Sequence, residues 1–403
     1  MSGTVLKKEQ RCSIMTVACM LAFFLSNISY LPYFADNGIT QYLSYPAWGL
    51  MLGVILIHRQ LQMDMRDVKF GLFALVMFAL MGIYGFVTGK SYYSALLTKC
   101  IFLALIIAVL GSMVAKTKTT WGTENRLLRT YVTASFILCT VVFFEYLIGQ
   151  DITSRIYSYR AKNETAFLAA SSFVILLYLP PAPKYKKLQV LFRILLAAFF
   201  FYMITGMRCR SMLVAAVAVL AIFLFQRNSS KGFKVVIVLG AFALLIAMQN
   251  EAVYDKLVNG ILLGGRETND VNDLTSGRLV QIARGWELFK QNLLFGTGDI
   301  GTVDCFFVSV LMQYGAPLGL CLIILGCYPF VWGVYNYRRI KSPVCMVMIL
   351  CAMTYIIGGI FEENAPFGPG TRCYISWFLF GYLRVQQANG YFAEEKHEED
   401  RTA

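Results

Sequence analysis

Charged residues and histidines are scarce in this chain of 403 residues. Only 15% of the residues are charged, and there are just two histidines, His58 and His397. No CxxC motif and no cluster of cysteines with histidines occurs, which argues against a zinc site. Most of the eleven cysteines lie inside apolar runs, where cysteine behaves as a small hydrophobic residue. The sequence therefore predicts neither a metal site nor a cofactor.

The scarcity of polar residues also excludes an ordinary water-soluble domain. Hydrophobic residues make up 58% of the chain, which is more than a soluble fold can hide from water. Apolar runs such as 101–110 and 235–247 are unbroken, whereas the strands of a membrane β-barrel alternate apolar with polar residues. Proline is rare, so long helices are allowed. The predicted fold class is an all-α integral membrane protein.

About twelve segments are apolar enough to cross a bilayer, which requires roughly 20 residues each. They are 12–31, 41–57, 70–88, 93–115, 130–149, 165–181, 190–206, 211–226, 233–249, 305–333, 343–361 and 373–387. Gly315-Ala316-Pro317 favours a kink in the tenth. No linker separates a second domain, so we expect one polytopic membrane domain over 1–403. It includes a long polar loop, 250–303, and a solvated tail, 388–403.

Lysine and arginine gather in alternate connections between the predicted spans. These basic connections are 7–11, 59–69, 116–129, 184–187, 227–234 and 338–341. Cytoplasmic loops of membrane proteins carry an excess of lysine and arginine, so this set is predicted to be cytoplasmic, together with both termini. The net charge of +13 follows from these loops, and no nucleic-acid partner is expected.

Several arginines fall on the other side, where the topological bias disfavours them. They are Arg155, Arg160, Arg208, Arg210, Arg278, Arg284 and Arg372. A guanidinium offers a planar fork of donors that suits phosphate oxygens. Any one of these arginines has an alternative role at the membrane interface or in an ion pair. As a set they favour an anion site, for which a lipid pyrophosphate is the obvious ligand.

The long loop contains a predicted amphipathic helix. Ser276 is the expected N-cap, and apolar residues recur at three- and four-residue spacing. The expected apolar stripe is Leu279, Ile282, Ala283, Trp286 and Phe289. Arg278 falls in the first turn, beside free backbone N–H groups that would also face a bound phosphate. Asp304 follows the loop as a candidate base for an attacking hydroxyl, with Glu362 and Glu363 as competing candidates.

The same residues carry a family resemblance. Residues 276–298 read SGRLVQIARGWELFKQNLLFGTG, followed by an acid and a helix with paired glycines, Gly315 and Gly319. This order resembles the signature of the O-antigen ligase and polymerase superfamily, in which proline is usual at the position of Leu293. Upstream, 205–212 resembles an Arg-Ser segment of the family, in which Arg210 fits better than Arg208. Arg160 resembles an arginine of an outer loop.

The resemblance implies a metal-independent membrane glycosyltransferase. Such enzymes take a glycan from undecaprenyl pyrophosphate and pass it to another lipid-linked sugar, as polymerases do, or to a lipid A core or protein, as ligases do. The family's ligases usually have histidine at the position of Asp304. We therefore expect a polymerase of O-antigen, capsular or exopolysaccharide repeat units, with a ligase as the alternative.

The working hypothesis places the active site on the outer face of a bacterial cytoplasmic membrane. Asp304 and Arg278 are the expected catalytic residues, and Arg210, Arg208, Arg160 and Arg278 are expected to bind the pyrophosphate. Lipid-linked donor and acceptor glycans and membrane lipid are the expected partners, with a chain-length regulator and a flippase of the same pathway.

Two other functions compete with an enzyme. A flippase or transporter of the same lipid-linked glycan predicts discontinuous helices and polar residues at mid-membrane, where only Lys99 and Glu145 are candidates. A membrane scaffold or sensor predicts a soluble signalling domain, and the sequence shows none.

Overall fold

The computed structural model is all-helical, with 84% helix and no strand among the residues it describes. The described residues are 14–57, 65–92, 100–116, 122–148, 159–179, 186–226, 231–255, 258, 275, 277–298, 303–368 and 372–388. Most of the predicted tail therefore lies outside them, as do Lys99 and Arg155. The prediction of an all-α chain is confirmed.

The helices follow the predicted apolar segments. They are α1 Ile14–Ile28, α2 Pro32–Asp36, α3 Thr40–Ile57, α4 Met65–Thr88, α5 Phe102–Lys116, α6 Gly122–Val142 with the π-helical turn Phe143–Leu147, α7 Lys162–Tyr178, α8 Lys186–Gly206, α9 Arg210–Phe225, α10 Lys231–Ala247, α11 Glu251–Tyr254, α13 Arg278–Gln291, α14 Phe306–Ile340, α15 Pro343–Gly359 and α16 Tyr374–Ala388. Glu145 lies exposed in the π-helical turn at the end of α6.

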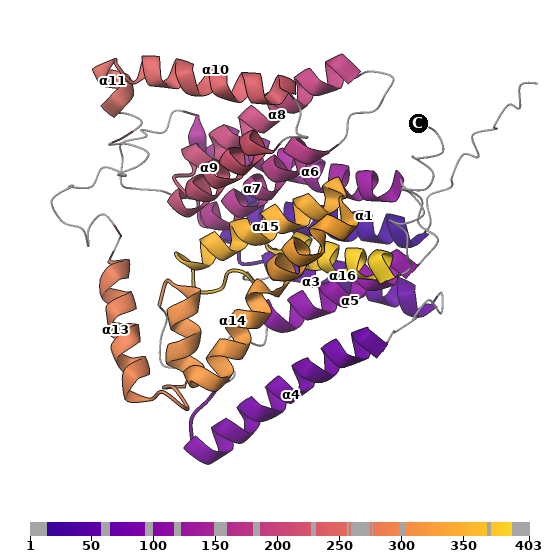
Figure 1. The fold of residues 1–403 in the computed structure, drawn as a ribbon, viewed down its shortest axis with the longest axis vertical. Helices are drawn as coiled ribbons and strands as arrows, with labels where there is room; N and C mark the ends of the chain where they lie inside the picture. The colour runs from indigo at the N-terminus through magenta and orange to yellow at the C-terminus, as the bar shows by residue number, and fades with distance from the viewer. Residues whose placement is uncertain are drawn as a thin grey trace, which may run out of the picture.

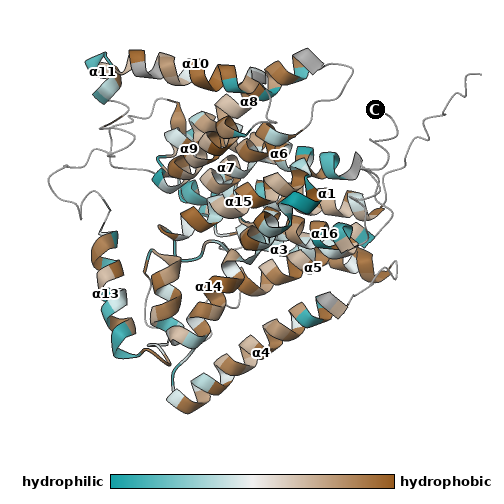
Figure 2. Cartoon of the chain, in the orientation of Figure 1, coloured by the Kyte–Doolittle hydropathy of each residue, from teal (hydrophilic) through white to brown (hydrophobic). Residues whose placement is uncertain are grey.

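The length and apolarity of the helices fit a membrane-embedded chain. Within the described residues, four helical segments are long and apolar enough to cross a bilayer: Asp67–Thr88, Glu124–Leu147, Leu188–Gly206 and Phe306–Ile340. Shorter apolar helices accompany them, among them α1, α9 and α15. In Figure 2, hydrophobic residues cover most of α4 and α10. The number of twelve crossings stays a prediction.

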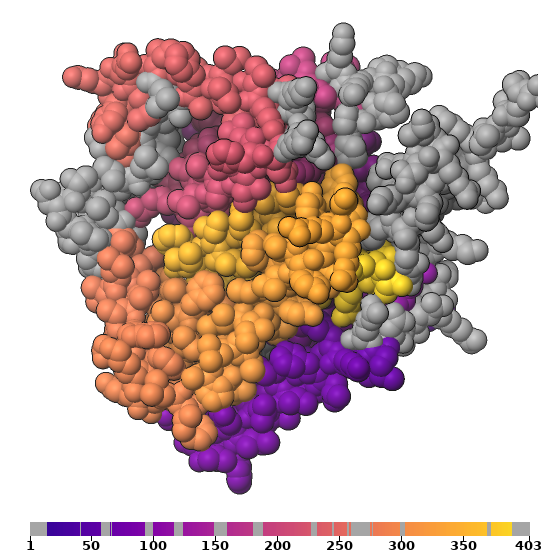
Figure 3. Space-filling view, viewed as in Figure 1, coloured from indigo at the N-terminus to yellow at the C-terminus, as the bar shows by residue number. Residues whose placement is uncertain are grey.

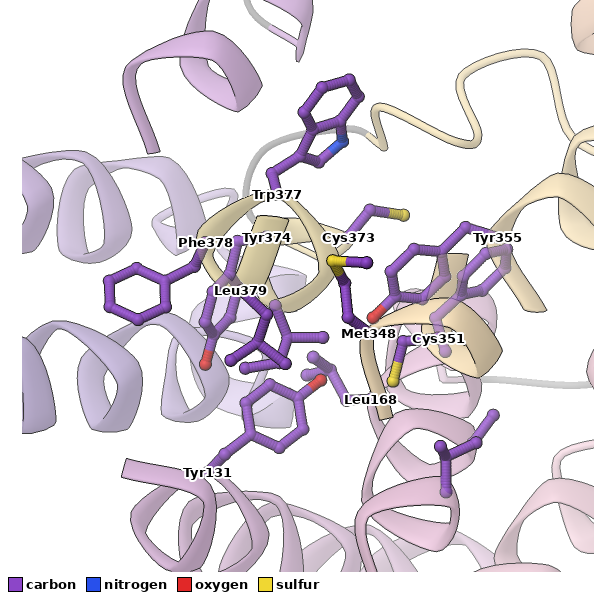
Figure 4. Packing of buried hydrophobic residues seen from close by; sticks show 14 of the residues in the cluster. Tyr131, Leu168, Met348, Cys351, Tyr355, Cys373, Tyr374, Trp377, Phe378 and Leu379 are labelled. Atoms are coloured by element: carbon purple, nitrogen blue, oxygen red, sulfur yellow. The ribbon is translucent and has the colours of Figure 1, made fainter. Parts of the chain in front are cut away.

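The centre of the bundle is built around α16. Trp377, Phe378 and Leu379 are buried there among side chains of neighbouring helices (Figure 4). The backbones of α16 and α5 touch at two glycines, because a Cβ at Gly381 would collide with the carbonyl oxygen of Ala108 and one at Gly111 with that of Phe378. Small residues at a helix–helix contact let the backbones approach closely, which is how membrane helices gain packing energy.

A buried polar network ties α16 to α1 and α6. The side-chain amide of Asn27 donates to the Tyr131 carbonyl oxygen at 3.1 Å and to the Ser135 hydroxyl at 2.8 Å. Its own oxygen accepts from the Tyr374 hydroxyl at 2.9 Å. A polar side chain inside an apolar bundle must find such partners, so Asn27 fixes the relative position of these helices.

The two ends of the bundle differ. In Figure 1, α13 runs crosswise to α10 and lies at the left margin, beside the first part of α14. We call this the α13 end; it also carries the turn 207–209 and the connection 360–368. At the opposite end, Asp67 is buried and forms ion pairs with Lys116 and Arg384.

Candidate functional site

The predicted loop helix forms and packs on α14 at the α13 end. Gly285 is buried so closely that a Cβ there would lie 3.0 Å from side-chain atoms of Val303 and Val308. Phe289 is buried as well, and Ile282 packs on the apolar cluster that contains Met312.

The predicted apolar stripe of α13 is only partly correct. Ile282 and Phe289 face α14, but Leu279, Ala283 and Trp286 are exposed. The helix is apolar on two faces, and spacing alone does not say which of them faces the protein. The start of the helix also shifts: Gly277, at φ 76°, occupies the N-cap position without a side-chain cap, while Ser276 lies outside the described residues.

The tenth predicted span is broken at Gly315, as the Gly-Ala-Pro sequence predicts. Gly315 has φ 70° and ψ 177°, which separates a first arm, 306–314, from the rest of α14. Gly319 then packs against the backbone of the first arm, because a Cβ there would lie 2.9 Å from the Val310 carbonyl oxygen. The break is therefore a fold-back of the chain, which is sharper than the tilt and kink expected from sequence.

The segment 292–298 satisfies the backbone groups that the break in α14 releases. A helix end leaves carbonyl oxygens without partners inside the helix. Here the backbone N–H of Thr297 donates to the Met312 carbonyl oxygen at 2.8 Å, and that of Gly298 to the Gln313 oxygen at 3.0 Å. On the other side of the break, the Ala316 N–H donates to the Leu293 oxygen at 2.6 Å.

The chain approaches itself so closely at this break that side chains are excluded. A Cβ at Gly296 would lie 2.5 Å from the Gln313 carbonyl oxygen, and one at Gly315 would collide with that of Leu294. The Lys90 ammonium, from the α4–α5 connection, also donates to the Gly296 oxygen at 3.2 Å. The Leu-Phe-Gly-x-Gly block is thus a brace for the broken helix.

Arg278 joins the start of α13 to two other segments. Its Nε lies 3.4 Å from Asp304 Oδ2, and its Nη2 lies 3.7 Å from Glu362 Oε1. The Asp304 backbone N–H donates to the Gln281 side chain at 3.2 Å, which holds the start of α14 against the first turn of α13. The two residues predicted to be catalytic are therefore neighbours in space. Asp304 remains half-exposed.

Arg278, Asp304 and Glu362 form a charged cluster, and Arg372 reaches it from just before the start of α16. Its side chain is only 1% exposed, its Nη1 lies 3.7 Å from Glu362 Oε2, and its guanidinium lies 4.3 Å from the centre of the Phe167 ring. Its Nε and Nη2 are buried and make no hydrogen bond to any described residue. Buried donors of this kind normally have partners, so this pair marks a candidate position for a ligand.

Glu362 is the carboxylate around which the site is organised. It ion-pairs with Arg278 and Arg372 and accepts a hydrogen bond from Asn163 at 2.8 Å. Burial raises its pKa above the usual range; Arg372 and Arg278 oppose that shift, while Glu164 and Asp304 add to it. Sequence placed Glu362 only among competing acids, because nothing local to 360–363 reveals which arginines surround it.

The turn with Arg208 and Arg210 lies within electrostatic range of this cluster. Burial raises the pKa of the Cys209 thiol, Glu362 raises it further, and Arg372 lowers it. Arg208 adopts φ 52°, and Arg210 is the first residue of α9. No described contact joins either arginine to Arg278 or Asp304, so their predicted role stays a prediction.

Arg160 lies just before α7 and is exposed. Three residues later, Asn163 reaches Glu362, so Arg160 lies beside the cluster along the chain without a described contact to it. The remaining predicted acid, Glu363, faces a different group: its Oε1 accepts from Ser309 and from Gln313, both at 3.0 Å. Glu363 is thus held by the first arm of α14, which favours a structural role.

The starts of α7, α9, α13, α14 and α16 all approach Glu362. Asn163, Arg278 and Arg372 contact it directly, while Cys209 and Asp304 lie within electrostatic range. Helix N-termini carry partial positive charge and free N–H groups, which favour anions. Among the described residues, no group of three or more His, Cys, Asp or Glu side chains is placed to hold a metal ion. No protein-family model and no curated protein sequence matches the chain.

Proposed function

We propose that this chain is a membrane glycosyltransferase that polymerises undecaprenyl-pyrophosphate-linked oligosaccharide repeat units, with the α13 end facing the outer side of a bacterial cytoplasmic membrane. One observation carries the proposal: two arginines and the starts of several helices converge on Glu362, and two buried donors of Arg372 make no hydrogen bond within the described part of the chain. An anion with several oxygens, such as a pyrophosphate, matches that arrangement of donors.

In the proposed reaction, a hydroxyl oxygen of the acceptor sugar attacks the anomeric carbon of the donor. The bond from that carbon to the pyrophosphate oxygen breaks, and undecaprenyl pyrophosphate leaves with the bonding electrons. Asp304 takes the hydroxyl proton, since it is half-exposed and held next to Arg278 at 3.4 Å. Arg278 and Arg372 stabilise the charge that grows on the leaving group.

Glu362 has a supporting part in this proposal. Its carboxylate lies between Arg278 and Arg372, 3.7 Å from each guanidinium group, and offsets their charge. Its raised pKa means that it accepts a proton more readily than an ordinary glutamate. Protonation on binding the pyrophosphate would release both guanidinium groups to the new anion, because a neutral carboxyl attracts them less.

The experiment is a length profile of surface polysaccharide in a strain that lacks the gene and is complemented with variants. We expect Arg278→Ala to give only single repeat units. Arg284→Ala is the matched control: it removes an exposed arginine of the same helix and is expected to give full-length polymer. Immunoblots of membranes check that both variants accumulate. Full-length polymer from Arg278→Ala would refute the role of this residue.

The same profile separates the alternatives. Long polymer that stays on undecaprenyl pyrophosphate and never reaches its final anchor would make the protein a ligase. Loss of all glycan from the outer face would make it a transporter, which is the second candidate because α14 is discontinuous at Gly315. The enzyme is favoured over the transporter because the break is braced by backbone hydrogen bonds from 293–298.

A further inference from the structure

Helix α4 stands apart from the bundle and borders a groove. Figure 3 shows it as a ridge along the lower edge of the molecule, next to α14. Its outward residues, such as Leu72, Leu75 and Phe86, are exposed and apolar, as expected for a helix in lipid. Between α4, α14 and α16, at the end opposite α13, lies a groove of about 550 Å³.

The walls of the groove are apolar and aromatic. Phe70 and Phe73 of α4 face Ile324, Tyr328 and Trp332 of α14 across it. Tyr328 and Trp332 both pack edge-on against Phe380 of α16, at 5.5 and 5.4 Å between ring centres. These contacts fix the two aromatic rings that line the groove. Tyrosine and tryptophan rings of this kind favour the level of lipid headgroups.

The groove narrows in the direction of the α13 end. Leu325 lines both the groove and a small, partly open cavity of about 10 Å³, whose other walls include Met77 and Met81 of α4. A helix with its side chains is roughly 10–12 Å across and cannot enter such a space. A hydrocarbon chain can lie in the groove and direct its end at the cavity.

The mouth of the groove is positively charged. Lys69, Arg384 and Gln387 line it, and Lys116 lies close by through its 3.0 Å bond to Asp67. Asp67 also pairs with Arg384, so among the described side chains here Lys69, Lys116 and Arg384 outnumber the carboxylate of Asp67. Arg384 is held in place by the Phe70 and Phe380 rings, at 5.7 and 5.6 Å. Charge therefore favours an anionic headgroup over a zwitterionic one.

We infer that this groove binds one anionic phospholipid, with the phosphate against Lys69 and Arg384 and an acyl chain between α4 and α14. The site lies at the opposite end of the bundle from Glu362, so it is separate from the proposed glycan site. Such a lipid would fill the space beside α4, which otherwise touches the rest of the protein along little of its surface.

The test uses the full-length protein in detergent, stripped of lipid and then incubated with phosphatidylglycerol or phosphatidylcholine. Native mass spectrometry counts the bound lipids, and thermal unfolding measures their effect. We expect one retained phosphatidylglycerol and a higher unfolding temperature. Phosphatidylcholine, whose choline group cancels the charge of its phosphate, should be retained roughly five-fold less. Equal retention of the two lipids would overturn the inference.

Two variants test the two halves of the site. Lys69→Glu reverses an exposed charge at the mouth of the groove and is expected to lower phosphatidylglycerol retention about five-fold or more. Ile324→Trp fills the groove without changing charge and is expected to abolish retention. Val334→Trp is the matched control, since it enlarges an exposed residue of α14 that does not line the groove. If Ile324→Trp retains lipid as Val334→Trp does, the inference fails, whatever the outcome of the polysaccharide profile.

Discussion

Arg278 and Asp304 meet at 3.4 Å although they are 26 positions apart in the chain. The pair links the first turn of α13 to the residue before the N-cap of α14, and both side chains are partly exposed to solvent. Partly exposed ion pairs contribute little to stability, typically less than about 1 kcal/mol. The pair therefore contributes little to the stability of the fold, which is compatible with the catalytic role proposed for it.

Replacing Asp304 separates activity from stability. We expect Asp304→Asn to lower the rate of chain extension by about 10²-fold or more, because an amide cannot take the hydroxyl proton. The unfolding temperature should stay within a degree or two of the wild type, given the small worth of the pair. Membrane preparations supplied with lipid-linked repeat units provide the rate. Glu287→Gln, which alters an exposed acid of α13 paired with Lys290, is the control and should keep the wild-type rate.

The raised pKa of Glu362 predicts a dependence of stability on pH. Its folded pKa lies above its unfolded value near 4.5, so the folded chain binds more protons. The stability that Glu362 contributes at low pH is therefore lost as pH rises through the raised pKa. We expect the free energy of unfolding of Glu362→Gln to fall less over this range than that of the wild type, measured by denaturation at a series of pH values.

Replacing Arg372 tests the pKa of Glu362 in a second way. Arg372 is the largest influence that lowers the pKa of Glu362, so Arg372→Met should raise that pKa further. Infrared spectra of the carboxyl stretch, assigned with Glu362→Gln, follow the protonation directly. An unchanged titration in Arg372→Met would show that the two side chains do not interact in the membrane.

The break in α14 predicts a strong effect of a small substitution. Gly315→Ala must place a Cβ against the Leu294 carbonyl oxygen at a positive φ, which costs about 1–3 kcal/mol. We expect faster proteolysis of the α13 segment and loss of chain extension. Gly240→Ala in α10, where a Cβ meets nothing within 4 Å, is the control and should behave as the wild type.

The contact between α16 and α5 predicts where the bundle tolerates no side chain. Gly381→Leu would drive the two backbones apart, and overpacking of this kind costs typically 1–3 kcal/mol or more. We expect a lower unfolding temperature of the purified protein. Gly53→Leu in α3, where a Cβ has open space, should leave the temperature nearly unchanged.

Hydropathy and turn chemistry predicted much of this architecture. The apolar segments are helices, α13 lies in the predicted loop, and the Gly-Ala-Pro sequence marks the break in α14, because these features depend on local sequence. The sequence named Arg278 and Asp304 as candidates, but their contact across α13 and the segment that follows it is a finding of the structure. The buried face of α13 did not follow, since both of its apolar stripes satisfy the same spacing.

Long-range packing accounts for what the sequence could not supply. The sequence placed Arg372 in the set of outer-side arginines, but nothing local predicts that it is almost completely buried, against the Phe167 ring and near Glu362. The brace between 293–298 and the break in α14 uses backbone atoms, which leave no trace in hydropathy or charge. Its local signs are the glycines Gly296, Gly298 and Gly315, which adopt positive φ.

The position of α16 has a consequence for the biogenesis of the protein. Asn27 in α1 is made early, but the Tyr374 hydroxyl that it accepts from is translated 347 residues later. Until then Gly111 of α5 also lacks its packing partner, the backbone of Phe378. The earlier helices are therefore synthesised before the centre of the bundle can be filled, and α16, the last described helix, fills it.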